Sequence, residues 1–209
     1  MAAKPGDLLG EVARYYSGKL AEHGATPRGV DWNGEEGQVL RFEQLARLLP
    51  AAPFSINDVG CGYGALFDFL AARCPQFEYV GWDVSPEMVG AARELHASRA
   101  NAHFVEGAVP EPADYSVASG IFNVRLGRSD GEWRAYLESS LDALHAASRR
   151  GFAFNCLTSY SDADRMRPDL YYADPCALFD LCKRRYSRDV ALLHDYGLYE
   201  FTILVRKSP

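Results

Sequence analysis

Short apolar runs alternate with amphipathic segments along most of the chain. A run of four to eight apolar residues between turn formers is typical of a buried strand, whereas apolar residues three and four positions apart are typical of one helix face. We therefore expect strands at residues 56–59, 77–82, 102–106, 115–122, 152–157, 190–193 and 201–205. Regular alternation of strands with helices predicts a mostly parallel sheet of the α/β class.

Several of the intervening helices carry recognisable end signals. Ser85 before Pro86 and Asp174 before Pro175 combine an N-cap residue with a proline at the first helical position, and Ser129 or Asp130 can cap the helix before the fifth strand. We expect that helix to stop at the basic residues and glycine of segment 149–151.

The last two strands are joined by only seven residues, 194–200. A parallel connection needs a crossover of a dozen or more residues, so these two strands must be antiparallel. The sequence therefore predicts a mostly parallel sheet that finishes in a hairpin.

Length and composition limit the classes of function. The 209 residues are 48% hydrophobic and 24% charged, which is typical of one globular domain, with helices in residues 1–52 preceding a core at 53–209. The net charge of -6 makes nucleic acid an unlikely partner. With no long apolar stretch and no signal-like start, we expect no membrane association and a cytoplasmic protein. The five cysteines form no pair with metal-ligand spacing, so we expect no metal site.

A glycine-rich turn, Gly60-Cys61-Gly62-Tyr63-Gly64-Ala65, follows the first strand and opens a helix. Such a turn lets the main chain approach a ligand closely. With Asp83 about twenty residues further on, the pattern satisfies a dinucleotide fingerprint. Cys61 within the turn can be a nucleophile or an apolar filler, and the absence of a neighbouring His or Lys favours the filler.

Asp58 decides against a dinucleotide. It stands two residues before Gly60, at the end of the strand, where its charge would repel a pyrophosphate. S-adenosylmethionine carries a sulfonium, an ammonium and a ribose diol, which suits Asp58 near its amino-acid end and Asp83 on its ribose.

These residues, together with Gly81-x-Asp83-x-Ser85-x-x-Met88, the strand end Phe104-Val105-x-Gly107 and the closing hairpin, give a recognisable set. Over residues 54–206 the chain resembles the Rossmann-like (class I) S-adenosylmethionine-dependent methyltransferases. The resemblance implies a three-layer, seven-stranded sheet with a reversed last strand, S-adenosylmethionine as methyl donor and S-adenosylhomocysteine as product. It also implies that Asp58, Gly60 and Gly62 line the methionine part, that Asp83 binds the ribose, and that Val84 and Met88 pack on adenine.

The chain departs from the family pattern after the third strand. The family often has an acid there to bind the adenine amine, whereas Gly107 is followed by Ala108, so we expect backbone contact at these two positions. Arg41, in the second helix, can reach the methionine carboxylate as a bidentate partner or lie on the surface.

The acceptor is expected at the strand ends and covering loops. We take Asn123, Tyr172 and His194 as catalytic candidates, with His194 as general base because its ordinary pKa lies near neutrality, and Trp32 and Asn155 as further site residues. These aromatic groups favour a small, planar or aromatic acceptor, with the accepting atom open. A nicotinamide-dependent oxidoreductase and a non-catalytic S-adenosylmethionine-binding regulator are the alternatives.

Overall fold

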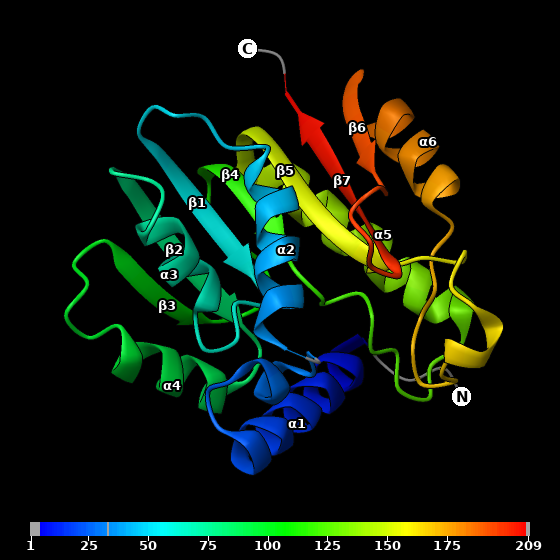
Figure 1. Cartoon of the computed structure of the whole chain (residues 1–209), viewed down its shortest axis with the longest axis horizontal. Helices are drawn as coiled ribbons and strands as arrows, with labels where there is room; N and C mark the ends of the chain where they lie inside the picture. Colours follow the sequence, from blue (N-terminus) through cyan, green and yellow to red (C-terminus); the bar gives the residue numbers. More distant parts are fainter. Residues whose placement is uncertain (1–4, 33, 208–209) are drawn as a thin grey trace.

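The computed structural model describes residues 5–32 and 34–207. Its centre is a seven-stranded sheet with the order β3-β2-β1-β4-β5-β7-β6 (Figure 1). β7 runs antiparallel to both β5 and β6, which confirms the closing hairpin. The strands are β1 (Phe54–Val59), β2 (Phe77–Asp83), β3 (Ala102–Glu106), β4 (Ala113–Ala118), β5 (Ser148–Leu157), β6 (Asp189–Leu193) and β7 (Glu200–Arg206).

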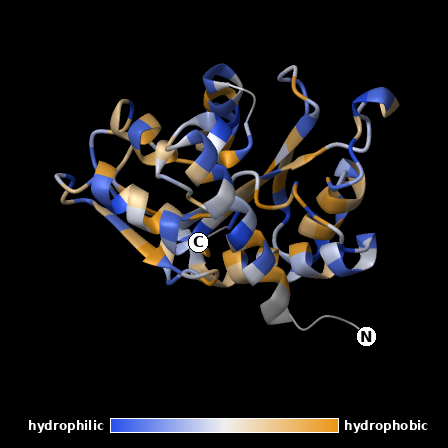
Figure 2. Cartoon of the chain, turned by 90° about the horizontal axis from the view of Figure 1, so that it is seen from below, coloured by the Kyte–Doolittle hydropathy of each residue, from blue (hydrophilic) through white to orange (hydrophobic). Residues whose placement is uncertain are grey.

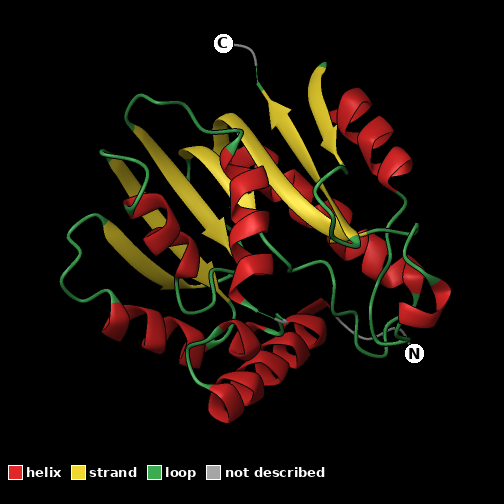
Figure 3. Cartoon of the chain, in the orientation of Figure 1, coloured by secondary structure: helices red, strands yellow, loops and turns green. Residues whose placement is uncertain are grey.

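Helices cover both faces of the sheet, and one more lies across the ends of its strands (Figure 3). α2, α3 and α4 pack on one face, whereas α5 and α6 pack on the other. α1 lies across the carboxyl ends of the central parallel strands (Figure 1). The helices are α1 (Pro5–His23), α2 (Glu35–Ala46), α3 (Ala65–Ala71), α4 (Pro86–Leu95), α5 (Asp130–Ala147) and α6 (Pro175–Arg185), with 3₁₀ turns at Pro27–Val30 and Ala163–Arg165.

The two faces of the sheet carry two separate apolar cores. Phe42 of α2 and Phe67 of α3 pack with Tyr79 of β2 on one face, while Leu137 of α5 packs with Phe154 of β5 on the other. Apolar residues therefore concentrate along the strands and the helix faces turned toward them (Figure 2). Within the described residues no helix is long and apolar enough to cross a membrane.

The helix starts follow the expected capping chemistry. The Ser85 hydroxyl accepts the Met88 N–H at 3.1 Å, and Ser129 forms a capping box with Glu132. Asp174 accepts the N–H groups of Cys176 and Ala177. These bonds satisfy donors that a helix start leaves unpaired, so α4, α5 and α6 begin where the sequence predicts.

Two predicted boundaries are wrong. β4 ends at Ala118 rather than at residue 122, because Gly120 turns the chain with φ +81° and its N–H donates to the Asn155 side chain. α5 passes directly into β5 at Ser148, so segment 149–151 lies in the strand instead of capping the helix. A Cβ on Gly151 would lie 2.5 Å from the Val205 carbonyl, so this glycine serves the close approach of β5 and β7.

Candidate active site

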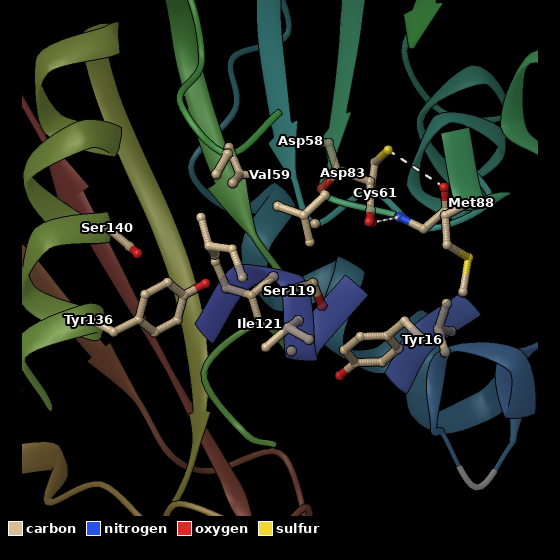
Figure 4. A pocket seen from close by; sticks show the side chains of 18 of the residues that line it. Tyr16, Asp58, Val59, Cys61, Asp83, Met88, Ser119, Ile121, Tyr136 and Ser140 are labelled. Carbon is tan, nitrogen blue, oxygen red and sulfur yellow. Dashed lines mark hydrogen bonds between the residues drawn. The ribbon is translucent and has the colours of Figure 1, made fainter. Parts of the chain in front are cut away.

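A cavity of about 580 Å³ opens at the carboxyl ends of β1, β2 and β4 and is covered by α1. This volume lies in the range typical of sites for small ligands. Its wall includes the glycine turn, the ends of β2 and β3, the segment after β4, part of α1 through Tyr16 and one side of α5 (Figure 4). The segment around Val30 and Trp32, the start of α2 and Arg128 complete it. The topology places it where an open α/β sheet binds ligands.

The glycine turn has the backbone that its sequence requires. Gly60 and Gly62 have φ values of +77° and +55°, a region that residues with a Cβ rarely adopt. A Cβ on Gly60 would lie 2.0 Å from Cγ2 of Ile121, and one on Gly62 would lie 2.8 Å from Cγ1 of Val30. Between them, burial raises the pKa of the Cys61 thiol well above its usual range, so Cys61 is an apolar wall residue and not a nucleophile.

Asp58 is buried at the end of β1 and borders the cavity. The Tyr79 hydroxyl donates to its Oδ2 at 2.6 Å. Burial raises the pKa of Asp58 to about 7, while the hydrogen bond from Tyr79 opposes that rise. Burial therefore makes the charged form of Asp58 unfavourable in the empty cavity. A cationic group bound beside it would stabilise that charged form.

Asp83 is the second buried carboxylate of the cavity. Its Oδ2 accepts the Gly62 N–H and its Oδ1 accepts the Ser85 N–H, both at 2.9 Å. Burial nevertheless raises its pKa above the ordinary value. Each oxygen keeps a second acceptor position, so Asp83 can fix the turn and still receive ligand hydroxyls.

We expect Tyr79→Phe to weaken binding of an ammonium-bearing ligand at neutral pH. Without the donated hydrogen bond the pKa of Asp58 rises further, so a smaller fraction carries the charge that attracts the ligand. Titration of S-adenosylmethionine between about pH 6 and 8 should show the variant's affinity rising at higher pH than the wild type's. Superimposable pH profiles would show that the hydroxyl does not tune Asp58. Tyr63→Phe, which removes a hydroxyl that donates to Gln38 and not to Asp58, is the matched control.

Most of the predicted donor-binding residues border one cavity. The structure brings together at its wall Asp58, Gly60, Cys61, Gly62, Asp83, Val84, Met88, Gly107 and Ala108. Their contact with a methyl donor stays a prediction. Their position around one cavity supports it.

Arg41 lies elsewhere. Its guanidinium forms two 2.7 Å hydrogen bonds with the Glu200 carboxylate and lies 3.9 Å from the centre of the Trp32 ring, and Arg41 is not among the residues that line the cavity. Arg41 instead supports Trp32, which does border the cavity, and contact of Arg41 with a ligand carboxylate stays a prediction.

The three catalytic candidates are also placed outside the cavity lining. Asn123 accepts the Leu157 N–H, and the Tyr172 hydroxyl accepts the Arg167 N–H. His194 is exposed in the hairpin between β6 and β7, against the rings of Tyr160 and Phe201. The strand order puts that hairpin at the far side of the sheet from β1 and β2, so proximity to strand ends alone did not locate the site.

Sequence reasoning missed several parts of the wall, above all two helices. α1 contributes Leu8, Leu9, Val12 and Tyr16, and α5 contributes Glu132, Ala135, Tyr136, Ser139, Ser140 and Ala143. The α5 residues recur at spacings of three and four opposite its buried leucines. That second, small and polar stripe was a readable signal for a helix side that faces a cavity rather than a core.

Comparison with known proteins agrees with this geometry. A family model described as a methyltransferase domain matches residues 56–150. The "Putative methyltransferase Rv1506c" of Mycobacterium tuberculosis is 70% identical over 164 residues, which cover 78% of this chain and 99% of that protein.

The chain belongs to the methyltransferase family. Its sheet order, with one reversed strand, and its glycine turn and two acids match the Rossmann-like class, whose members use S-adenosylmethionine as methyl donor. The nicotinamide alternative is thereby set aside.

Other methyltransferases share parts of the chain or its fold. Trans-aconitate 2-methyltransferase of Mycobacterium sp. (strain KMS) is 45% identical over 71 residues, and the match spans 34% of this chain and 28% of that enzyme. The magnesium protoporphyrin IX methyltransferase of Synechocystis PCC 6803, solved with bound SAM, superposes with a TM-score of 0.69 at 16% identity, covering all of both chains. The structure described as a DhpI-SAM-HEP complex gives a TM-score of 0.66 at 14% identity, over 99% of this chain and all of that one. These solved structures show the shared fold.

Proposed function

We propose that this methyltransferase transfers the methyl group of S-adenosylmethionine to a small, planar or aromatic molecule bound in the same cavity. One observation carries the donor part of the proposal: Asp58 and Asp83, both buried, flank a glycine turn that leaves no room for a Cβ, and all three border one cavity. A ligand with a cationic amino-acid end and a ribose diol matches that pair of acids. A nicotinamide dinucleotide would bring its pyrophosphate against Asp58.

The residues present fit the donor part by part. Asp58 would face the ammonium group, and Asp83 the ribose hydroxyls. Val84, Met88 and the backbone at Gly107 and Ala108 would enclose the adenine. S-adenosylmethionine supplies an activated methyl group on a sulfonium, and S-adenosylhomocysteine is the product.

The chain's own contribution is alignment and exclusion of water. Within the described part of the cavity wall there is no histidine and no lysine, so no imidazole or amine is placed to act as general base. Methyl transfer by in-line displacement needs chiefly a nucleophile held on the line of attack in a dry site. α1 closes the cavity over the strand ends and supplies that cover (Figure 1).

We also propose that the protein is cytoplasmic. All five cysteines are free, as expected in a reducing compartment.

The function is tested by incubating the purified protein with isotope-labelled S-adenosylmethionine and a metabolite extract, followed by mass spectrometry. We expect label in one or a few small molecules and stoichiometric S-adenosylhomocysteine, both strongly reduced with Asp83→Ala at a donor concentration near the wild-type Kd. Donor binding without any labelled product would favour the non-catalytic regulator instead.

A further inference from the structure

The cavity extends well beyond the space that the glycine turn and the two acids define. On its far side α1 presents Leu8, Leu9 and Val12, and α5 presents Ala135, Ser139 and Ala143. This second compartment lies next to the proposed donor site, and its interpretation rests on the proposed function.

Charge in this compartment is already paired. Within the described wall Arg128 is the one basic residue, and its guanidinium lies 2.7 Å from the Glu11 carboxylate. The Glu132 carboxylate accepts the N–H and hydroxyl of Ser129 in the capping box. The other charged groups of the wall are the carboxylates Asp58 and Asp83. An anionic acceptor would therefore meet net negative charge, and the basic residue of the described wall is already paired with a carboxylate.

Two tyrosines supply the neutral polar groups. Tyr16 projects from α1 and Tyr136 from α5, with Ile121 and Ser119 between them (Figure 4). Loss of hydration raises the pKa of Tyr16 well above its usual range and that of Tyr136 to about 12, so both are neutral hydroxyls at neutral pH. Ser140, which lies near Tyr136 on α5, opposes the rise in the Tyr136 pKa (Figure 4). A neutral hydroxyl can both donate and accept.

We propose that the methyl acceptor is an uncharged molecule whose apolar body lies between α1 and α5 and whose hydroxyl group is bound by Tyr16 and Tyr136. The apolar wall stabilises the bound acceptor in proportion to the apolar surface that binding removes from water. The tyrosine hydroxyls orient the acceptor by hydrogen bonding to its hydroxyl group. Carboxylate-rich acceptors are disfavoured.

The proposal is tested with two probes that share one ring system, 2-naphthol and 2-naphthoate, titrated against the protein saturated with S-adenosylhomocysteine. We expect naphthol to bind about tenfold or more tightly than naphthoate, because the carboxylate loses hydration without gaining a cation. Equal or tighter binding of naphthoate would overturn the uncharged class. Tighter binding of methyl glucoside than of naphthol would overturn the apolar body.

Variants locate the effect. Val12→Lys places a cation on the cavity side of α1 and should narrow or reverse the preference for naphthol, whereas Ala13→Lys, on the same helix but outside the lining, should leave it unchanged. Tyr16→Phe and Tyr136→Phe should each weaken naphthol but not naphthalene, and Tyr15→Phe, whose hydroxyl donates to Asp31, is the control. Naphthol affinity that is unchanged in both cavity tyrosine variants would refute their role.

Failure of this inference can be told from failure of the proposed function by titrating S-adenosylmethionine into the same proteins. Normal donor binding with a preference for naphthoate refutes only the acceptor class. Absence of donor binding by the wild type refutes the proposed function.

Discussion

Glu200→Ala is expected to destabilise the protein by about 3–5 kcal/mol, which is the usual cost of removing one partner of a buried ion pair. The Glu200 and Arg41 side chains are only 1% and 11% exposed, and they form a bidentate pair with both hydrogen bonds at 2.7 Å. The truncation leaves the Arg41 charge in a poorly hydrated position with only the Gly37 carbonyl and the Trp32 ring as partners. Urea unfolding of the two proteins measures the difference.

Two controls test whether the loss of stability comes from leaving a buried charge unpaired. Asp180→Ala breaks the pair with Arg184, whose side chain is 78% exposed, and should leave the unfolding midpoint almost unchanged. The double variant Arg41→Met, Glu200→Leu removes both charges and should recover most of the lost stability. If Glu200→Ala unfolds at the wild-type urea concentration, the pair does not hold the fold together.

The same variant should also weaken the methyl-donor site. Trp32 stacks on Arg41, borders the cavity and packs where a Cβ on Gly120 would lie 2.5 Å from its ring. Glu200 therefore supports one wall of the cavity through Arg41 and Trp32. We expect the double variant to regain stability but not full donor affinity, because Met lacks the planar cation that stacks on the indole.

Asp58→Asn is expected to weaken S-adenosylmethionine binding by about 1.5–3 kcal/mol, which corresponds to a loss of roughly tenfold to a hundredfold in affinity. The amide keeps the shape of the side chain and can still accept the Tyr79 hydroxyl, but it no longer offers a charge to the ligand's ammonium. Wild-type affinity should rise as the pH increases toward and past about 7, where Asp58 ionises, and the variant should lose this rise. Calorimetry at several pH values measures both effects.

Without ligand, the same substitution should raise folding stability at high pH, whereas it lowers donor affinity there. Because the folded-state pKa of Asp58, about 7, lies above its unfolded value, the folded protein binds the extra proton between about pH 4 and 7. Wild-type stability from this group is therefore lost as the pH rises through that window. Asp58→Asn should come closest to the wild type near pH 4 and be the more stable protein near pH 8. Equal stability at both pH values would show that Asp58 carries no burial penalty.

Much of the fold was predictable because it is encoded locally. Ser85, Ser129 and Asp174 cap helices through bonds to residues two or three positions away, so neighbouring residues suffice to predict them. The seven-residue connection between β6 and β7 fixes their direction in the same way. The glycine turn and Asp83 were predictable because positive φ values and an acid at a strand end leave a direct mark on the sequence.

The rest depends on contacts between distant residues. Arg41 meets Glu200 across 159 positions, and nothing near either residue indicates which partner it takes. His194 follows the strand-end rule but belongs to the hairpin at the far side of the sheet. Tyr16 and Tyr136 lie on α1 and α5, whose placement relative to the sheet is a tertiary property. Sequence reasoning therefore found the glycine-turn side of the cavity wall better than the side formed by these helices.

The central claim is that the turn at Gly60–Gly62 and its two acids bind S-adenosylmethionine. The most direct measurement is calorimetric titration of S-adenosylmethionine into the wild type, Asp83→Ala and Glu106→Ala, since Asp83 and Glu106 are partners in register on neighbouring strands but only Asp83 lines the cavity. The account predicts binding to the wild type and Glu106→Ala, with affinity about tenfold or more lower for Asp83→Ala. Equal affinity of all three proteins, or binding of NAD in place of S-adenosylmethionine, would contradict it.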